Sequence, residues 1–312
     1  MINKIKNNFN SFSFIAIVIL ALFAPYILTP FLLTVLIRVL YMTILTYSLS
    51  FLAGKGGMVS LGQTLFFGLS GYTLAILLIS HGFSHWTAIL AAMGAALVGA
   101  LLIGLITIRT TGVYFIMISL ALGQMAWAVA LQWSSLTHGD DGIIGIRPPD
   151  LFGFSLTNRV NFYYLLLISF VLIFLFLRMI SLSKFGLALK AVSNNPDKIQ
   201  SLGYNTSLIR YISFVISGFI AGLSALFFVY YNGIISPVTV GINQAVWILV
   251  AAILGGINSL IGPLIGVTAV ILMEVQLSRF TDRYMMIIGT VFILVILFMP
   301  EGIWGKIQEL RR

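Results

Sequence analysis

Long runs of hydrophobic residues follow one another along the whole chain, separated by short polar stretches. A run of about 18 apolar residues is long enough to cross a bilayer as a helix. We therefore expect an all-α, polytopic transmembrane protein in which residues 1–312 form a single membrane-embedded domain. The predicted spans are Phe12–Leu28, Phe31–Phe51, Thr64–Ser80, Trp86–Ile108, Gly112–Trp133, Phe162–Ile180, Ile209–Tyr231, Gln244–Met273 and Tyr284–Met299.

The run Gln244–Met273 differs from the others because the stretch "GGINSLIGP", Gly255–Pro263, places helix breakers near its middle. Irregular backbone at membrane depth is tolerated only where it is surrounded by protein or lines a cavity. A single crossing would leave the basic tail "GKIQELRR" outside the cell, against the usual distribution of positive charge. We favour two short passes over a re-entrant hairpin. This gives about ten membrane segments including a broken pair, with both termini in the cytoplasm.

Composition and charge agree with this interpretation. Hydrophobic residues make up 60% of the chain and charged residues only 8%, whereas soluble domains contain about 25% charged residues. The net charge of +9 comes from scattered residues and predicts no nucleic-acid partner, because Lys and Arg in short loops mark the cytoplasmic side of a membrane protein. Lys4, Lys6, Lys55 and Arg109 therefore lie inside in this topology, and the acidic loop 134–161 lies outside, which predicts a multi-pass protein of the plasma or inner membrane.

One passage interrupts the apolar pattern: "SKFGLALKAVSNNPDKIQSLGYN", within a loop of about residues 182–208. Its first half predicts a short amphipathic helix. Asn195 is a typical N-cap, Pro196 suits the first helical position, and Asp197 suits the positive end of the helix dipole. With Gly203 as the stop signal, the pattern predicts a cytoplasmic helix at residues 196–202. Such a helix either lies in the lipid headgroups or docks into a groove of a partner protein, and the residues alone favour neither.

Several function classes are excluded by missing motifs. The chain has no Walker pattern, no G-x-S-x-G nucleophile and no cysteine, so we expect no nucleotide hydrolysis, no enzyme and no thiolate metal site. His81 and His85 lack an acidic neighbour, and we expect no metal there. Arg38 is interpreted as a snorkelling residue and Glu274 as an interfacial cap or pairing residue, which gives ion-coupled transport little support. A transporter of this kind needs energy from another polypeptide.

Four blocks in order resemble the LivM-type permease subunits of branched-chain amino-acid ABC importers. They are "GKGGMVSLGQTLFFGLSGYTLAIL", "GVYFIMISLALGQM" with "LTHGDDGIIGI", the interrupting passage, and "LGGINSLIGPLIG". The resemblance covers nearly the whole chain after residue 40 or so. It implies that the interrupting passage contacts a cytoplasmic ATPase. The implied coupling residues are Phe185, Leu187, Lys190, Ala191, Pro196, Asp197, Ile199, Leu202 and Gly203.

The resemblance also implies the partners. Two cytoplasmic ATPase subunits hydrolyse ATP, so this chain carries no cofactor. A second permease subunit, favoured as a distinct relative, completes the path, and an external binding protein delivers branched-chain amino acids. Related importers for urea or short amides remain an alternative, as does a stand-alone channel or facilitator in the bilayer.

Polar residues within the spans are the candidates for the translocation path. For each, the alternative role is a hydrogen bond between helices. The candidates are Ser60, Gln63, Thr64, Ser70, Ser119, Gln124, Asn243 and Gln244. Two small-xxx-small patterns, Gly218 with Gly222 and Gly262 with Gly266, predict close helix packing within the subunit or at a dimer seam.

Overall fold

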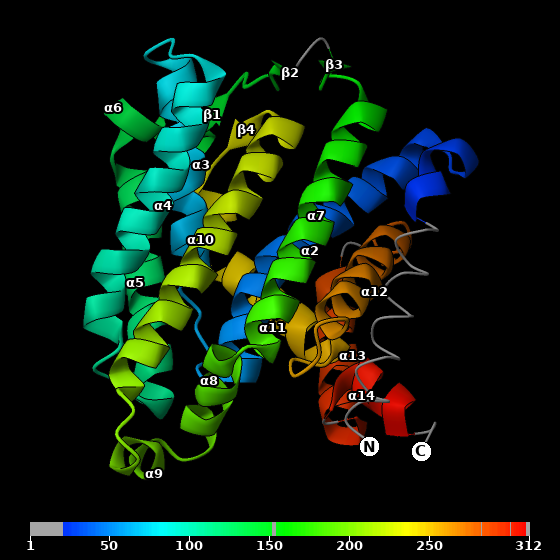
Figure 1. Cartoon of the computed structure of the whole chain (residues 1–312). Coiled ribbons are helices and arrows are strands. Elements are labelled where there is room, and N and C mark those ends of the chain that lie inside the picture. The colour runs from blue at the N-terminus through cyan, green and yellow to red at the C-terminus, as the bar shows by residue number, and fades with distance from the viewer. Residues whose placement is uncertain (1–20, 152–153, 282, 300, 310–312) are drawn as a thin grey trace.

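The computed structural model describes residues 21–151, 154–281, 283–299 and 301–309. Within these residues the fold is a bundle of helices joined by short turns and two-residue strands (Figure 1). Six helical segments are long and apolar enough to cross a membrane, and three shorter ones are also apolar. The helices are α2 Pro30–Gly56, α3 Gln63–Ile79, α4 His85–Thr107, α5 Gly112–Gln132, α6 Ser134–Thr137, α7 Arg159–Leu182, α8 Lys184–Asn194, α9 Pro196–Ser201, α10 Thr206–Asn232, α11 Ile242–Gly255, α12 Gly262–Leu277, α13 Tyr284–Phe298 and α14 Gly302–Glu309. The strands are β1 Ile143–Ile144, β2 Asp150–Leu151, β3 Phe154–Ser155 and β4 Ile234–Ile235, and the 3-10 turns are η1 Gly139–Asp141 and η2 Pro237–Thr239.

The predicted apolar runs correspond to helices, with ends that differ by a few residues. The first run, Phe12–Leu28, lies mostly outside the described residues, as do Lys4 and Lys6, but residues 21–27 are helical. Pro25 has no backbone N–H and leaves the carbonyl of Ala21 without its usual helical donor. The hydroxyl of Tyr163 donates to that carbonyl at 2.7 Å, which attaches this first helical segment to α7.

The run Gln244–Met273 is divided into α11 and α12, as its central breakers predict. The two helices pack backbone to backbone. A Cβ atom at Gly266 would overlap the carbonyl oxygen of Ala251, and one at Gly255 would overlap the carbonyl oxygen of Gly262. Glycine at these positions therefore allows the hairpin to close, since any side chain would separate the helices.

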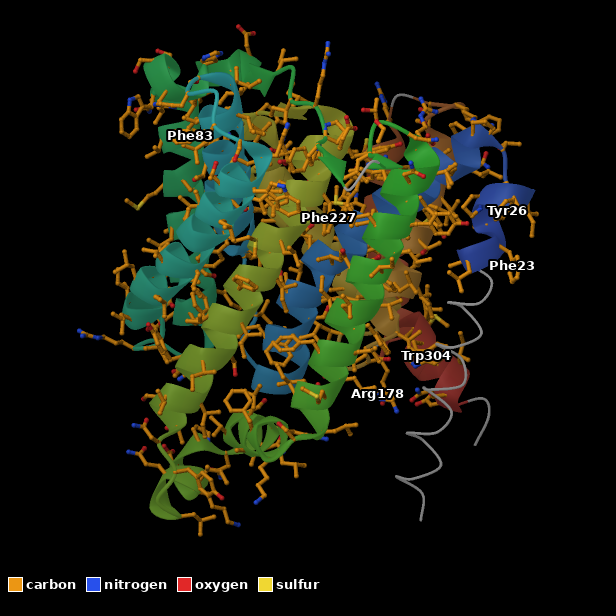
Figure 2. The ribbon with its side chains drawn as sticks, turned by 45° about the horizontal axis from the view of Figure 1, so that its top comes forward. Phe23, Tyr26, Phe83, Arg178, Phe227 and Trp304 are labelled. Atoms are coloured by element: carbon orange, nitrogen blue, oxygen red, sulfur yellow. The ribbon has the colours of Figure 1, made fainter. Side chains whose placement is uncertain are left out.

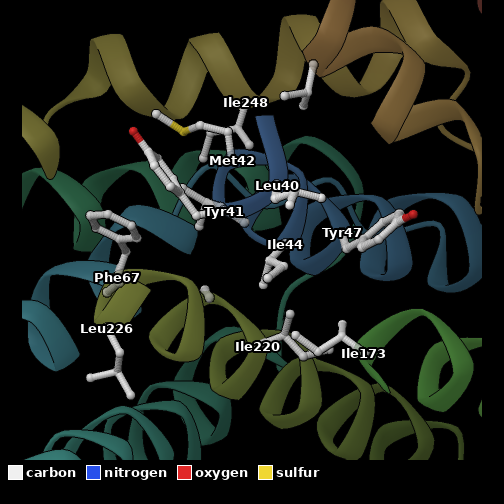
Figure 3. Close-up of a cluster of buried hydrophobic side chains, with 14 of the residues drawn as sticks. Leu40, Tyr41, Met42, Ile44, Tyr47, Phe67, Ile173, Ile220, Leu226 and Ile248 are labelled. Carbon is white, nitrogen blue, oxygen red and sulfur yellow. The ribbon is translucent and has the colours of Figure 1, made fainter. Parts of the chain in front are cut away.

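Helices α2 and α10 form the centre of the bundle. In the most apolar stretch of each, 78% of the α2 residues and 61% of the α10 residues are buried, against 22% in α4 and in α5. Figure 3 shows Leu40, Ile44 and Tyr47 of α2 among side chains from α7, α10 and α11. The outer surface is apolar as well, as the exposed Phe23 and Tyr26 illustrate (Figure 2). This arrangement suits a bundle whose periphery contacts lipid.

Helices α2 and α10 correspond to one another in length, in their C-terminal caps and in their contacts, as in an inverted structural repeat. Each helix has 27 residues and is followed by a glycine in the left-handed conformation, Gly57 at φ 64° and Gly233 at φ 69°. Each glycine begins a similar tetrapeptide, "GMVS" and "GIIS". Adding 176, the difference between 233 and 57, to the residue numbers of α2 and its tetrapeptide gives those of α10 and its tetrapeptide.

The contacts between the two helices are reciprocal under the same shift. Ser217 Oγ donates to the carbonyl of Ser48 at 2.6 Å, and Ser224 Oγ donates to the carbonyl of Tyr41 at 2.7 Å. The shift converts Tyr41 to Ser217 and Ser48 to Ser224, so the two contacting residue pairs exchange places as in an isologous contact, although both hydroxyl donors belong to α10. The flanking helices agree, because α3 and α4 pack on α10 while α11 and α12 pack on α2. Inverted repeats of this kind are common in transporters.

The two ends of the bundle differ in structure and charge. Helices α8, α9 and α14 lie at one end, and α6 and the short strands lie at the other (Figure 1). Lys55 and Lys190 belong to the α8 end, whereas Asp140 and Asp141 lie in η1 at the opposite end. There β1 pairs with β4, with Ile143 opposite Ile235, which joins the loop after α5 to the loop after α10.

Candidate functional site

The interrupting passage folds as its caps predict. Ser183 caps α8 by accepting a hydrogen bond from the Gly186 N–H at 3.3 Å. Asn195 Oδ1 accepts from the Lys198 N–H at 3.0 Å, and Pro196 is the first residue of α9. Gly203 follows with φ +87°. The predicted short helix is thus confirmed, except that Leu202 is its cap rather than its last residue.

The two helices present one face to the bundle and another to the surroundings. In α8, Gly186, Leu189 and Val192 are buried, while Leu187 is 65% exposed. Leu202, beyond α9, is 67% exposed. We call the outward set the α8–α9 surface. It consists of the exposed Leu187, Lys190, Pro196, Asp197, Leu202 and Gly203, bordered by the half-buried Phe185, Ala191 and Ile199.

The inner side of α8 contacts the end of α2 and the start of the next segment. Leu189 Cδ1 would lie 3.5 Å from a Cβ atom at Gly56. At Gly57, whose φ is +64°, a Cβ atom would overlap the hydroxyl of Ser193 and lie 3.2 Å from its Cβ. Helix α8 and the chain that leaves α2 are therefore in direct contact.

Residues 57–62, which follow α2, are not helical and pass inside the bundle. The Leu61 N–H donates to Ser119 Oγ of α5 at 3.1 Å, and the Gly62 N–H donates to Ser60 Oγ at 3.2 Å. Ser119 is the eighth residue of α5, which places it roughly 10 Å along the helix from its start. Helix α3 thus begins within the bundle, and two of the path candidates hold its unwound approach in place.

Helix α11 also begins within the bundle. A Cβ atom at Gly68, in the second turn of α3, would lie 2.8 Å from Val240 Cγ2, just before α11. The N-caps of α3 and α11, Gly62 and Gly241, make no side-chain capping bond. Two shorter helices, of 17 and 14 residues, therefore start close to one another, and both contact α5. Broken helices of this type form the substrate sites of many transporters.

The remaining path candidates fall into two groups. Gln63, Thr64, Gln124, Asn243 and Gln244 lie on the mutually contacting helices α3, α5 and α11. Gln63 is 1% exposed, and its side-chain atoms have no hydrogen-bond partner among the described residues. Gln244 Nε2 lies 3.4 Å from Met42 Sδ, and Asn243 is exposed.

Ser70 lies instead where α3 packs on α10, since its Cβ would be 3.4 Å from a Cβ atom at Gly222. At Gly218, a Cβ atom would lie 2.8 Å from Ala100 Cβ. This glycine pair therefore lies inside the subunit, between α10 and its neighbours α3 and α4.

Sequence reasoning missed an ion pair within the bundle. Arg38 of α2 donates to Glu274 Oε2 of α12 at 2.6 Å, and the Trp247 indole N–H of α11 donates to Glu274 Oε1. The pair joins the central helix to the α11–α12 hairpin. Arg279, which is nearer to Glu274 in sequence, lies over the Phe31 ring instead. Because 236 positions separate the partners, no local pattern could have revealed the pair.

The histidines have ordinary hydrogen-bond geometry. His81 Nδ1 lies 3.3 Å from the carbonyl of Ile76, and His85 Nδ1 lies 3.3 Å from the hydroxyl of Tyr230. Across the described part of the chain, no group of three or more His, Cys, Asp or Glu residues is placed to hold a metal ion. The candidate functional sites are therefore the α8–α9 surface and the starts of helices α3 and α11.

Comparison with known proteins identifies a family of membrane permeases, in agreement with the helical bundle described above. The family described as "Branched-chain amino acid transport system / permease component" matches residues 31–296. The chain is 26% identical, over 93% of its length and 73% of the relative, to the high-affinity branched-chain amino acid transport system permease protein LivM of Escherichia coli. It is 32% identical to BraD of Pseudomonas aeruginosa over 50% of this chain and 52% of that one. It is 30% identical to LivH of Escherichia coli over 40% of this chain and 41% of that one.

Proposed function

The chain belongs to the family of permease components of branched-chain amino acid transport systems, and from this premise we propose that it forms the translocation path of an ATP-driven importer for these amino acids. It is a transport permease and not an enzyme. The observation that carries the ATP-driven part is the α8–α9 surface, where Leu187 and Leu202 are more than half exposed at one end of the bundle. Helix-in-groove docking uses such apolar anchors.

In the proposed topology, residues 1–312 form one domain with about ten membrane segments. The described part supplies α2, α3, α4, α5, α7, α10, α11, α12 and α13. The α8 end faces the cytoplasm, because Lys55, Arg109 and Lys190 gather there and positive loops remain inside. Helix α14 packs on the α11–α12 turn at the same end, since Gly256 and Gly302 are in close contact. This placement supports a cytoplasmic C-terminus, and the N-terminus follows if one span precedes α2.

The partners follow from the same premise. Two cytoplasmic ATPases dock on this chain and on a second permease, and an external binding protein delivers the amino acid. The relatives include permeases with two names, LivM and LivH, which supports a distinct second permease. Closure of the ATPase pair moves α8, and contact at Gly57 moves the unwound segment that leads to α3. The path between α3, α5 and α11 then alternates between the two sides.

Uptake by reconstituted vesicles tests this function. With the second permease, the ATPases and the binding protein present, we expect leucine uptake that requires both ATP and the binding protein. Liposomes containing this chain alone should show no leucine flux. Leucine flux through the chain alone without ATP would instead support a facilitator, and ATP-driven uptake of urea but not leucine would contradict the proposed substrate.

A further inference from the structure

Arg210, in the first turns of α10, joins three elements at the α8 end of the bundle. Its Nη2 donates to the carbonyl oxygen of Thr110 at 2.8 Å, in the turn between α4 and α5. Its Nε lies 3.2 Å from Met58 Sδ, in the unwound segment that leads to α3. One half-buried guanidinium therefore links α10 to the starting points of both helices that flank the proposed path.

The acceptors are available for structural reasons. Thr110 precedes Thr111, the N-cap of α5, so its carbonyl lies outside the hydrogen-bond ladder of that helix. Met58 follows the left-handed Gly57, and its own N–H closes the end of α2 by donating to the carbonyl of Leu52 at 3.2 Å. The thioether of Met58 accepts only weakly, so the Thr110 carbonyl is the stronger of the two contacts.

Arg210 also lies directly after the α8–α9 surface along the chain. Asn205 caps α10 by accepting from the Leu208 N–H at 2.9 Å, and α10 contacts both α8 and α9. The neighbouring Tyr211 donates its hydroxyl to the carbonyl of Leu101 of α4 at 2.9 Å. The start of α10 is thus bonded to α4, to the α4–α5 turn and to the segment before α3.

From this geometry we infer that Arg210 is a positioning residue that converts displacement of the α8–α9 surface into movement of the starts of α3 and α5. The inference rests on the proposed ATP-driven function. When the surface moves, α10 moves with it, and the guanidinium carries the Thr110 carbonyl and Met58 along. Without these bonds, the ATPases still dock and hydrolyse ATP, but their movement displaces the starts of α3 and α5 less.

The test measures uptake and ATP hydrolysis together in vesicles that contain the full complex. Arg210→Met retains the apolar stem and removes the bonds. We expect the amount of leucine taken up per ATP hydrolysed to fall about tenfold. A fall of this size corresponds to losing the free energy of one hydrogen bond from a charged donor. Arg210→Lys, which retains the charge but not the two-pronged reach, should give an intermediate ratio. Arg109→Met in the exposed α4–α5 turn is the control and should leave the ratio unchanged.

The ratio separates this role from a purely structural one. If uptake and hydrolysis fall in the same proportion in Arg210→Met, or if neither changes, the inference is overturned. Should Arg210→Met fail to assemble, the ratio in Arg210→Lys decides, and a wild-type ratio in that variant would count against the inference. A wild-type complex that takes up no leucine with ATP contradicts the proposed function itself, and so is distinguishable from failure at Arg210.

Discussion

Replacing Leu202 by aspartate is expected to abolish ATP-driven uptake while the membrane-embedded helices remain folded. Leu202 is 67% exposed beyond the end of α9, so little packing within the chain is lost. Placing a charge in the apolar groove of a docked partner leaves that charge without water or a counterion. Truncating a central interface anchor commonly costs about 2 kcal/mol or more, which weakens binding by roughly 30-fold.

The measurement is the amount of ATPase that remains bound when the complex is purified through this chain, together with uptake by vesicles. Leu202→Met preserves an apolar side chain of similar size and should behave as the wild type. If Leu202→Asp retained the ATPases in full and transported at the normal rate, the α8–α9 surface would not be the docking site.

Replacing Gly266 by alanine is expected to disrupt the α11–α12 hairpin and lower the thermal midpoint of the protein markedly. The new Cβ atom would overlap the carbonyl oxygen of Ala251 and lie 2.7 Å from the Gly255 nitrogen, both of which are backbone atoms that cannot rotate away. Overpacking of this kind costs about 1–3 kcal/mol, and sometimes more. Because the hairpin packs on α2, the loss should extend to the centre of the bundle.

Gly94→Ala provides a matched control for this substitution. Gly94 is also inside an apolar helix, α4, but a Cβ atom there would meet no heavy atom within 4 Å. We expect an unchanged or slightly higher midpoint, because alanine favours a helix over glycine by about 0.5–1 kcal/mol. The midpoints are measured on the purified proteins in detergent. Equal midpoints for Gly266→Ala and Gly94→Ala would mean that the two short helices do not pack as described.

Much of the fold could be predicted because membrane spans and helix ends are determined by short stretches of sequence. The apolar runs, the breakers in "GGINSLIGP" and the caps Asn195 and Pro196 each act within a few residues, and each corresponds to the observed helix or helix end. The inverted repeat was missed, because its sequence signal is reduced to "GMVS" and "GIIS". The matching helix lengths, the paired serine contacts between α2 and α10 and the packing of the flanking helices reveal it in the structure.

The candidate site was less predictable, because polar residues within spans have roles set by distant partners. The polarity of Ser60 and Ser119 makes them path candidates, but their hydroxyls hold the unwound segment before α3. The sequence favours a position for Arg38 near the membrane surface, yet its guanidinium pairs with Glu274 of the neighbouring helix α12. In contrast, Gln63 remains a candidate for direct contact with solute, because its buried amide has no partner in the described part of the chain.

The most direct test of the account is the side of the membrane on which the α8–α9 surface lies. The chain contains no cysteine, so single cysteines introduced as Ser201→Cys and Thr157→Cys can be labelled without background. Both positions are exposed, at opposite ends of the bundle. With an impermeant maleimide, we predict that Ser201→Cys is labelled only from the cytoplasmic side and is protected when the ATPases are bound, while Thr157→Cys is labelled only from outside. Labelling of Ser201→Cys from outside the cell would contradict the account.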